Sequence, residues 1–337
     1  FTAVDDAYTP EKTVAAVRRL VDEGVFAMLG NVGTPTATVA LPILAERGVP
    51  AVGFFTGAGV LRPGEGRVLN YRASYSQEVA AVLESAIAAG LSPRAVCAFV
   101  QNDGYGMAGV IGLRRVLERQ SGVEDMVKAL DAILGLPGED PPRNGIGPVG
   151  VYQRNTFASR DGYVSLKDWE RRNGLPCRLV VTVGTYNAVA KFAAYARYKG
   201  EQWLLSAVSF TGADALRREL AAARIDDGVV VSQVVPPLDA ALPIVVAAKS
   251  ALGSDFGYVS LEGFIVGRLF LAVAREVEGE LTRDAFMRAA LGRRFNVGGL
   301  ALDFTDDNQG SDLVVVDLLE DGRYRTLDAG DWRRLLN

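Results

Sequence analysis

The sequence predicts an α/β protein with a buried parallel sheet and enough chain for two lobes. Its 337 residues exceed the size of one ordinary domain. Short continuous apolar segments of strand length alternate with amphipathic helical segments, which is the pattern of parallel sheets covered by helices. Hydrophobic residues make up 49% and charged residues 23% of the chain, which is typical of a globular protein.

The first part of the chain repeats one rhythm of helix and strand. In each repeat a Thr suits the N-cap of a helix, a Pro suits its first turn and a Gly suits its C-terminal stop. The predicted elements are a helix from Thr9 to Gly24, a strand at Val25–Leu29, a helix from Thr34 to Gly48 and a strand at Val49–Phe54.

The same rhythm continues to the end of the chain. Further strands are predicted at Ala95–Val100, Val149–Tyr152, Leu179–Val183, Trp203–Phe210, Gly228–Val235, Leu300–Phe304 and Leu313–Leu319. Further helices are predicted at Met107–Arg119, Asn187–Tyr198, Ala213–Ala223, Tyr258–Val277 and Thr282–Leu291. One stretch, Leu136–Arg160, is rich in Gly and Pro and is predicted to be a long surface loop.

Composition argues against several classes of function. The chain has no His, which removes Ser–His–Asp and Cys–His catalysis and the commonest zinc ligand. We therefore expect no catalytic residues, no metal site and no cofactor. The net charge of −4 supplies no broad basic field for nucleic acid. No uninterrupted apolar run reaches the ~18 residues that span a bilayer.

The two cysteines lie far apart in the sequence. Cys97 and Cys177 each sit in or beside an apolar segment of strand type. We expect two small buried apolar residues rather than a disulfide, and no CxxC redox motif is present. The cysteines therefore leave the cellular compartment open.

Two loops at predicted strand ends have the chemistry of a binding site. Gly30–Thr36 follows a strand and opens a helix, where free N–H groups and the positive end of the helix dipole meet. The hydroxyls of Thr34 and Thr36 add donors, so this loop suits a carboxylate at the carboxyl end of the sheet. The alternative is that Thr34 merely caps its own helix. The next loop, Phe54–Ala58, offers Thr56 and Gly57 for polar contact.

The segment Gly104–Gly109 matches the G-x-G-x-x-G pattern of dinucleotide-binding turns. Tyr105 stands where the pyrophosphate would approach the backbone. Glu124 and Asp125 have the spacing of the acidic residue that binds ribose, but they lie in a polar helical context rather than at a strand end. The sequence therefore favours other functions over dinucleotide binding.

Several acidic residues have both a functional and a structural interpretation. Asp214 follows a strand and could bind a ligand ammonium group, although an N-cap or solvated acid is the simpler interpretation. Asp5 and Asp6 precede a helix and are expected to stabilise its start rather than to form an acid–base dyad. The acidic group near the end of the chain lacks the spacing of a calcium loop. This group comprises Asp303, Asp306, Asp307 and Asp312.

The chain resembles the leucine/isoleucine/valine-binding family of ABC-transporter substrate-binding proteins, which have periplasmic-binding fold type I. The resemblance covers nearly the whole chain in order. It is carried by Val4–Lys12, Gly30–Thr36, Gly48–Pro50, Asn102–Gly106, Gly184–Tyr186, Gly212–Asp214, Tyr258–Gly263 and Asp306–Asp312.

The resemblance implies two Rossmann-like lobes joined by a three-strand hinge, with a solute bound in the cleft. It implies lobe 1 at residues 1–75 and 237–303, and lobe 2 at residues 76–236 and 304–337. The matching ligand-binding positions are Val32, Gly33, Thr34, Thr56 and Gly57 in lobe 1, Tyr105, Thr185 or Tyr186, and Asp214 in lobe 2, and Tyr258 with a weaker register. Asp214 stands where amino-acid binders of the family use Glu to hold the ammonium.

Two departures from the family pattern stand out. The chain begins at Phe1, without an initiator Met or a signal peptide, and lacks the first β–α unit of lobe 1. It is therefore expected to be a mature or truncated product, or to have lost that unit. The second departure is the Leu136–Arg160 insertion.

The expected function is extracytoplasmic capture of an amino acid or a related small carboxylate or amide for the membrane permease of an ABC importer. The expected location is the periplasm or the exterior of the cell, and the family allows a lipid anchor in the full-length precursor. A ligand-sensing domain of a receptor or of an amide-responsive regulator is the alternative. A dinucleotide-dependent enzyme is a weaker one, and nucleic acid is not an expected partner.

Overall fold

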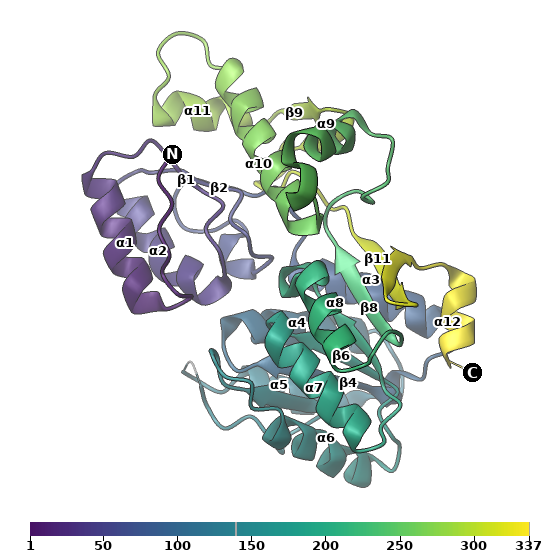
Figure 1. The fold of residues 1–337 in the computed structure, drawn as a ribbon. Coiled ribbons are helices and arrows are strands. Elements are labelled where there is room, and N and C mark those ends of the chain that lie inside the picture. Colours follow the sequence, from purple (N-terminus) through teal and green to yellow (C-terminus); the bar gives the residue numbers. More distant parts are fainter. Residues whose placement is uncertain (139, 337) are drawn as a thin grey trace. The chain divides into compact units, whose positions relative to one another are not determined.

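The computed structural model describes residues 1–138 and 140–336, which fold into two compact units. Unit 1 comprises residues 1–74 and 234–313, and unit 2 comprises residues 75–233 and 314–337. The chain passes from one unit to the other three times, as the predicted three-strand hinge requires. Figure 1 follows this path from purple to yellow. No helix in the described part of the chain is long and apolar enough to cross a membrane.

Residues 304–313 belong to unit 1 rather than to the second lobe, where the sequence placed them. Backbone pairing with Asn70 explains the difference. The N–H of Asn70 donates to the carbonyl of Asn308 at 2.8 Å, and the N–H of Gly310 donates to the carbonyl of Asn70 at 2.9 Å. The side chain of Asn308 also donates to the carbonyl of Leu61 at 3.0 Å.

Unit 1 contains a short parallel sheet in the order β1–β2–β3. The strands Met28–Leu29 (β1) and Ala51–Val52 (β2) are shorter than predicted, and Val68–Leu69 (β3) was not predicted. The helices α1 (Pro10–Asp22) and α2 (Thr34–Glu46) lie side by side and bury Val17, Leu41 and Leu44 (Figure 1). Unit 1 also contains α9 (Pro243–Leu252), α10 (Tyr258–Arg275), α11 (Arg283–Ala290), β9 (Arg294–Val297) and β10 (Leu300–Asp303).

Unit 2 contains a seven-stranded sheet in the order β12–β11–β8–β7–β6–β4–β5. The five strands from β8 to β5 are parallel, whereas β11 and β12 add an antiparallel edge. The strands are β4 (Val96–Gln101), β5 (Val149–Tyr152), β6 (Leu179–Val183), β7 (Leu204–Ala207), β8 (Val229–Gln233), β11 (Val315–Glu320) and β12 (Arg323–Thr326). All residues of β4 to β8 are buried, as expected for a parallel sheet covered by helices.

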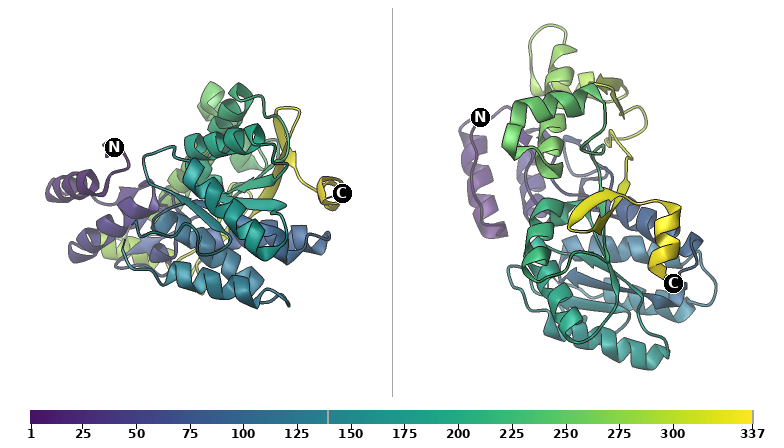
Figure 2. Two further views of the ribbon diagram at one scale, coloured as in Figure 1. Left: turned by 90° about the horizontal axis from the view of Figure 1, so that it is seen from below. Right: turned by 45° about the vertical axis from the view of Figure 1, so that its right-hand side comes forward.

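Helices lie between these parallel strands along the chain: α4 (Gly104–Leu117), α5 (Glu124–Leu134), α6 (Arg160–Asn173), α7 (Tyr186–Tyr198) and α8 (Ala213–Ala222). The helix α3 (Tyr75–Ala88) precedes β4, and α12 (Ala329–Leu336) follows β12. The last segment of the chain returns to unit 2, where α12 packs near α3 (Figure 2). The predicted α/β class with parallel sheets is therefore confirmed.

The expectation of two unlinked cysteines was wrong, because Cys97 and Cys177 form a disulfide. Cys97 lies on β4, and Cys177 precedes β6, which pairs with β4 in parallel. This pairing brings the two Cα atoms to 5.8 Å although 80 residues separate them in the sequence. Structural disulfides are typical of oxidising compartments outside the cytoplasm.

Removal of this disulfide should destabilise unit 2. We expect the double variant Cys97→Ala with Cys177→Ala to lose about 2–5 kcal/mol of unfolding free energy, because the bond closes a long loop in the unfolded chain. Urea unfolding with and without reductant measures this: reductant should destabilise the parent chain and leave the double variant unchanged. Two reactive thiols in the denatured, unreduced parent would contradict the bond itself.

Candidate functional site

The first candidate loop, Gly30–Thr36, lies between β1 and α2 in unit 1. Gly33 occupies the N-cap position with φ of 101°, and Thr34 is the first residue of the helix. Thr34 therefore does not cap its helix. Its hydroxyl lies 2.7 Å from the hydroxyl of Thr56, which follows β2, and both side chains are buried. The predicted neighbouring position of these two loops is thus present in the structure.

Some of the hydrogen-bond donors of the Gly30–Thr36 loop are already bonded within the loop. The hydroxyl of Thr36 donates to the carbonyls of Val32 and Gly33, so it stabilises the loop. The backbone N–H groups of Thr34 and Thr36 belong to the first turn, where a helix has no carbonyl of its own to bond them. Together with the helix dipole, these groups and the Thr34–Thr56 hydroxyl pair favour an anion.

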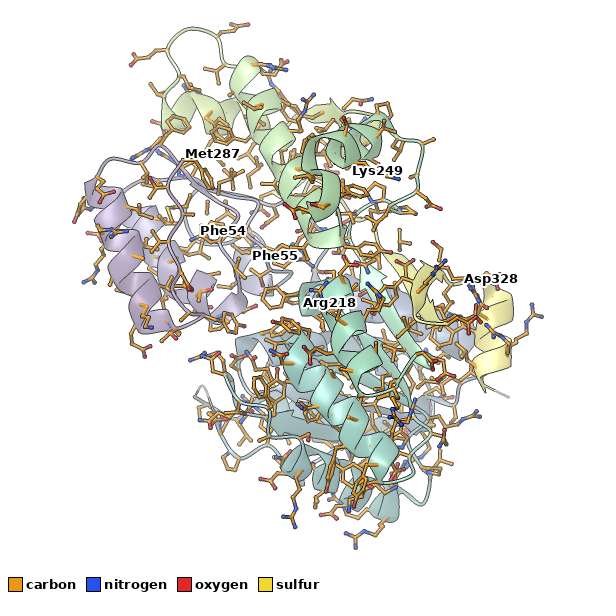
Figure 3. The ribbon with its side chains drawn as sticks, viewed as in Figure 1. Phe54, Phe55, Arg218, Lys249, Met287 and Asp328 are labelled. Carbon is orange, nitrogen blue, oxygen red and sulfur yellow. A yellow bond between two sulfur atoms is a disulfide. The ribbon has the colours of Figure 1, made fainter. Side chains whose placement is uncertain are left out.

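An apolar wall adjoins these donors. Val32 and Phe55 face each other in an isolated parallel bridge, and Val32 is 54% exposed. Phe55, labelled in Figure 3, is half-buried. Its ring centroid lies 5.0 Å from the guanidinium of Arg72. Arg72 pairs in turn with Glu262 at 3.5 Å, and both of these side chains are buried. Sequence reasoning missed this pair, because 190 residues separate its members and no local pattern links them.

The other two predicted positions of unit 1 flank these groups. Gly57 is buried directly after Thr56. Tyr258 is half-buried at the first position of α10, one helical turn before Glu262. Their contact with a ligand stays a prediction.

In unit 2, Tyr105 lies in the first turn of α4. Its side chain is fully buried, its hydroxyl donates to the carbonyl of Gly184 at 3.3 Å, and its ring packs on Tyr75 and Phe210 at centroid distances of 5.1 and 4.8 Å. The hydroxyl of Thr211, which the sequence did not single out, donates to the same carbonyl at 2.9 Å. These bonds join the loops after β4, β6 and β7.

Thr185, Tyr186 and Asp214 also lie at helix starts of unit 2. The N–H of Thr185 donates to the hydroxyl of Tyr152 at 3.0 Å, and Tyr186 is exposed at the first position of α7. Asp214 is half-buried in the first turn of α8, whose N-cap is Gly212. Asp214 is therefore not the cap. Burial raises the pKa of Tyr324, and the nearby Asp214 carboxylate raises it further.

Asp103 organises the start of α4. Its carboxylate accepts the N–H of Tyr105 at 2.9 Å and the side-chain amide of Gln101 at 2.7 Å, and Arg154 lies 3.4 Å away. Burial raises the pKa of Asp103, although these hydrogen bonds and Arg154 oppose the rise.

Part of the Leu136–Arg160 insertion is buried, which corrects its interpretation as a surface loop. Arg143 is buried and donates to the side-chain carbonyl of Asn102 at 2.7 Å and to the backbone carbonyl of Ile133 at 3.1 Å. The amide of Asn102 donates back to the carbonyl of Pro141 at 2.8 Å. The insertion therefore braces the residue that precedes Asp103.

We expect Arg143→Met to destabilise unit 2 by about 2–4 kcal/mol, because buried carbonyls would lose their donor. Arg160→Met is the matched control: Arg160 is exposed, and its loss should change the unfolding free energy by no more than about 0.5 kcal/mol. Urea unfolding followed by circular dichroism compares the two, and equal effects would show that Arg143 does not brace the loop.

The G-x-G-x-x-G segment serves packing. A Cβ at Gly106 would stand 1.9 Å from the carbonyl oxygen of Gln101, and one at Gly109 would stand 2.3 Å from Val183. Glu124 and Asp125 open α5 rather than ending a strand. The next described strand, β5, ends at Tyr152 rather than at the acidic residue that a dinucleotide-binding turn uses.

Within residues 1–138 and 140–336, no group of three or more His, Cys, Asp or Glu side chains has the arrangement of a metal site. In the acidic C-terminal group, Asp303 accepts the hydroxyl of Thr305 at 2.6 Å and its N–H at 3.0 Å, and it pairs with Arg294 at 2.7 Å. These bonds hold the pKa of Asp303 below its usual value.

Comparison with known proteins decides the family. Residues 1–131 match the family model for periplasmic binding proteins. A possible leucine/isoleucine/valine-binding protein from Rhodopirellula baltica SH 1 is 36% identical, with a TM-score of 0.85 over 99% of this chain and 85% of that one. The chain belongs to the leucine/isoleucine/valine-binding family of ABC-transporter substrate-binding proteins. No protein of curated function showed significant sequence similarity.

Two less similar proteins share the fold. A branched-chain amino acid ABC transporter protein from Thermus thermophilus with bound valine is 18% identical, with a TM-score of 0.72 over 96% of this chain and 83% of that one. A solute-binding protein from R. palustris in complex with benzoate has the same identity, the same TM-score and the same coverage of both chains. Members of this periplasmic family are binding proteins that act outside the cytoplasm, and the Cys97–Cys177 disulfide agrees with that location.

Proposed function

We propose that this protein captures an amino acid or a related small carboxylate or amide and delivers it to the permease of an ABC importer. The observation that carries the proposal is the buried Thr34–Thr56 hydroxyl pair, 2.7 Å apart at the start of α2. Hydroxyl and N–H donors at a helix start stabilise a carboxylate without a charged partner.

The apolar wall beside these donors suits the body of such a ligand. Val32 is a large apolar side chain that is more than half exposed, and Phe55 lies next to it. The related proteins with bound valine and benzoate hold carboxylates with apolar bodies, which supports this ligand class.

The proposal assigns contacts in both units. Val32, Gly33, Thr34, Thr56, Gly57 and Tyr258 are the assigned positions in unit 1, and Tyr105, Thr185, Tyr186 and Asp214 are those in unit 2. Asp214 would hold an ammonium group. Because the Tyr105 hydroxyl and ring are engaged within unit 2, we assign it the shaping of its loop as well as contact with a ligand. We further propose that the full-length precursor carries a lipid anchor.

A thermal-shift panel of L-amino acids, small carboxylates and amides tests this function. A solute present at about 100 times its Kd adds about 2.7 kcal/mol of stability to the folded state. We expect at least one member of the panel to raise Tm. Saturable NAD(P) binding with no response to the panel would favour the enzyme alternative instead.

Two single-residue variants test where the solute binds. We expect Thr34→Ala and Asp214→Ala each to weaken binding of the identified solute by about tenfold, since each removes one hydrogen-bonding or charged partner. Thr38→Ala is the matched control, because Thr38 is exposed on the same helix and bonds only its own helix backbone among the contacts described. Isothermal titration measures all three, and unchanged affinity in both test variants would place the site elsewhere.

A further inference from the structure

Two consecutive residues near the start of the chain have unusual backbone geometry. Ala7 and Tyr8 have φ values of 51° and 55°, in the left-handed region that residues other than Gly rarely adopt. Such residues persist where surrounding contacts enforce them, often beside functional sites. Contacts with neighbouring residues must therefore stabilise this turn.

Two carboxylates hold the turn. Asp5 accepts the N–H of Ala7 at 2.8 Å, and Asp6 accepts the N–H of Tyr8 at 2.9 Å. The second oxygen of Asp6 accepts the hydroxyl of Thr13 at 2.6 Å. Because Thr13 is buried on α1, which packs on α2, the turn is fixed to the framework of unit 1.

The ring of Tyr8 lies against the loop that carries the proposed anion donors. A Cβ atom at Gly33 would stand 2.2 Å from Cε2 and 2.9 Å from Cδ2 of this ring. Gly33 also has φ of 101°, so both its backbone and its surroundings require Gly. The next residue is Thr34, whose hydroxyl meets Thr56.

We propose that Tyr8 is a positioning residue of the anion loop Gly30–Thr36. Its ring, set by the Asp5–Asp6 turn, presses on Gly33 and thereby aims the N–H groups of Thr34 and Thr36. The effect on ligand affinity rests on the proposed function, whereas the effect on loop order does not.

Hydrogen–deuterium exchange of the full chain tests the positioning. Peptides covering residues 30–38 should exchange about tenfold faster in Tyr8→Ala, because the loop would open locally without its brace. Tyr8→Phe keeps the ring and should stay within about twofold of the parent. Tyr198→Ala is the matched control, since Tyr198 is 82% exposed on α7. Asp6→Ala loosens the turn while keeping the ring and should accelerate the same peptides.

Binding of L-leucine, L-valine and benzoate gives the second readout. For whichever of these binds the parent chain, Tyr8→Ala should raise Kd about fivefold or more while Tyr8→Phe leaves it unchanged. Unchanged exchange in folded Tyr8→Ala and Asp6→Ala would overturn the inference, as would faster exchange with unaltered affinity. Faster exchange in a chain that binds none of these solutes would uphold the positioning and count against the proposed function.

Discussion

Parallel strand pairing is the constraint on which the rest of this structure depends. Parallel neighbours end at the same edge of a sheet, and the chain must leave that edge through a loop and a helix. In unit 1 this places the Gly30–Thr36 loop beside Thr56, so that two hydroxyls from residues 22 apart meet at 2.7 Å. In unit 2 it gathers the loops that follow β4, β6 and β7 around the carbonyl of Gly184. The candidate residues are brought together by topology rather than by sequence proximity.

The features that the sequence predicted well are those with a local cause. The Pro at the start of α1 and α2 and the apolar strands of unit 2 follow from local preferences, and their elements were found within a few residues. Short strands with weak local patterns, such as β3, β9 and β12, were not predicted because their partners define them. The helix α3 was also missed, although Ser74 directly precedes it and Gln77 follows three residues later, which is the spacing of a capping box.

The sequence pointed to candidate positions but not to the hydrogen bonds between them. The sequence pointed to Thr34 and Thr56 because each follows a strand. It could not show that Gly33 takes the N-cap position and frees the Thr34 hydroxyl, since that depends on one backbone angle. The Cys97–Cys177 disulfide and the Arg143–Asn102 hydrogen bond could not be predicted from the sequence either. The first depends on the pairing of β4 with β6, and the second depends on the path of the loop that carries Arg143. Buried polar groups of this kind find partners across long stretches of sequence.

The chemistry assigned to unit 1 is suited to reversible capture. A carboxylate held by an ion pair in a buried site must lose the hydration of two charges, and release must restore it. Hydroxyl and backbone N–H donors carry no full charge, so they recognise a carboxylate by geometry at a smaller desolvation cost. Such recognition depends on donors that are already aimed before the ligand arrives. The hydroxyls of Thr34 and Thr56 are hydrogen-bonded to each other, so each already restricts the rotation of the other. Under the proposed function, backbone rigidity around Gly33 therefore sets how well this loop would discriminate between ligands.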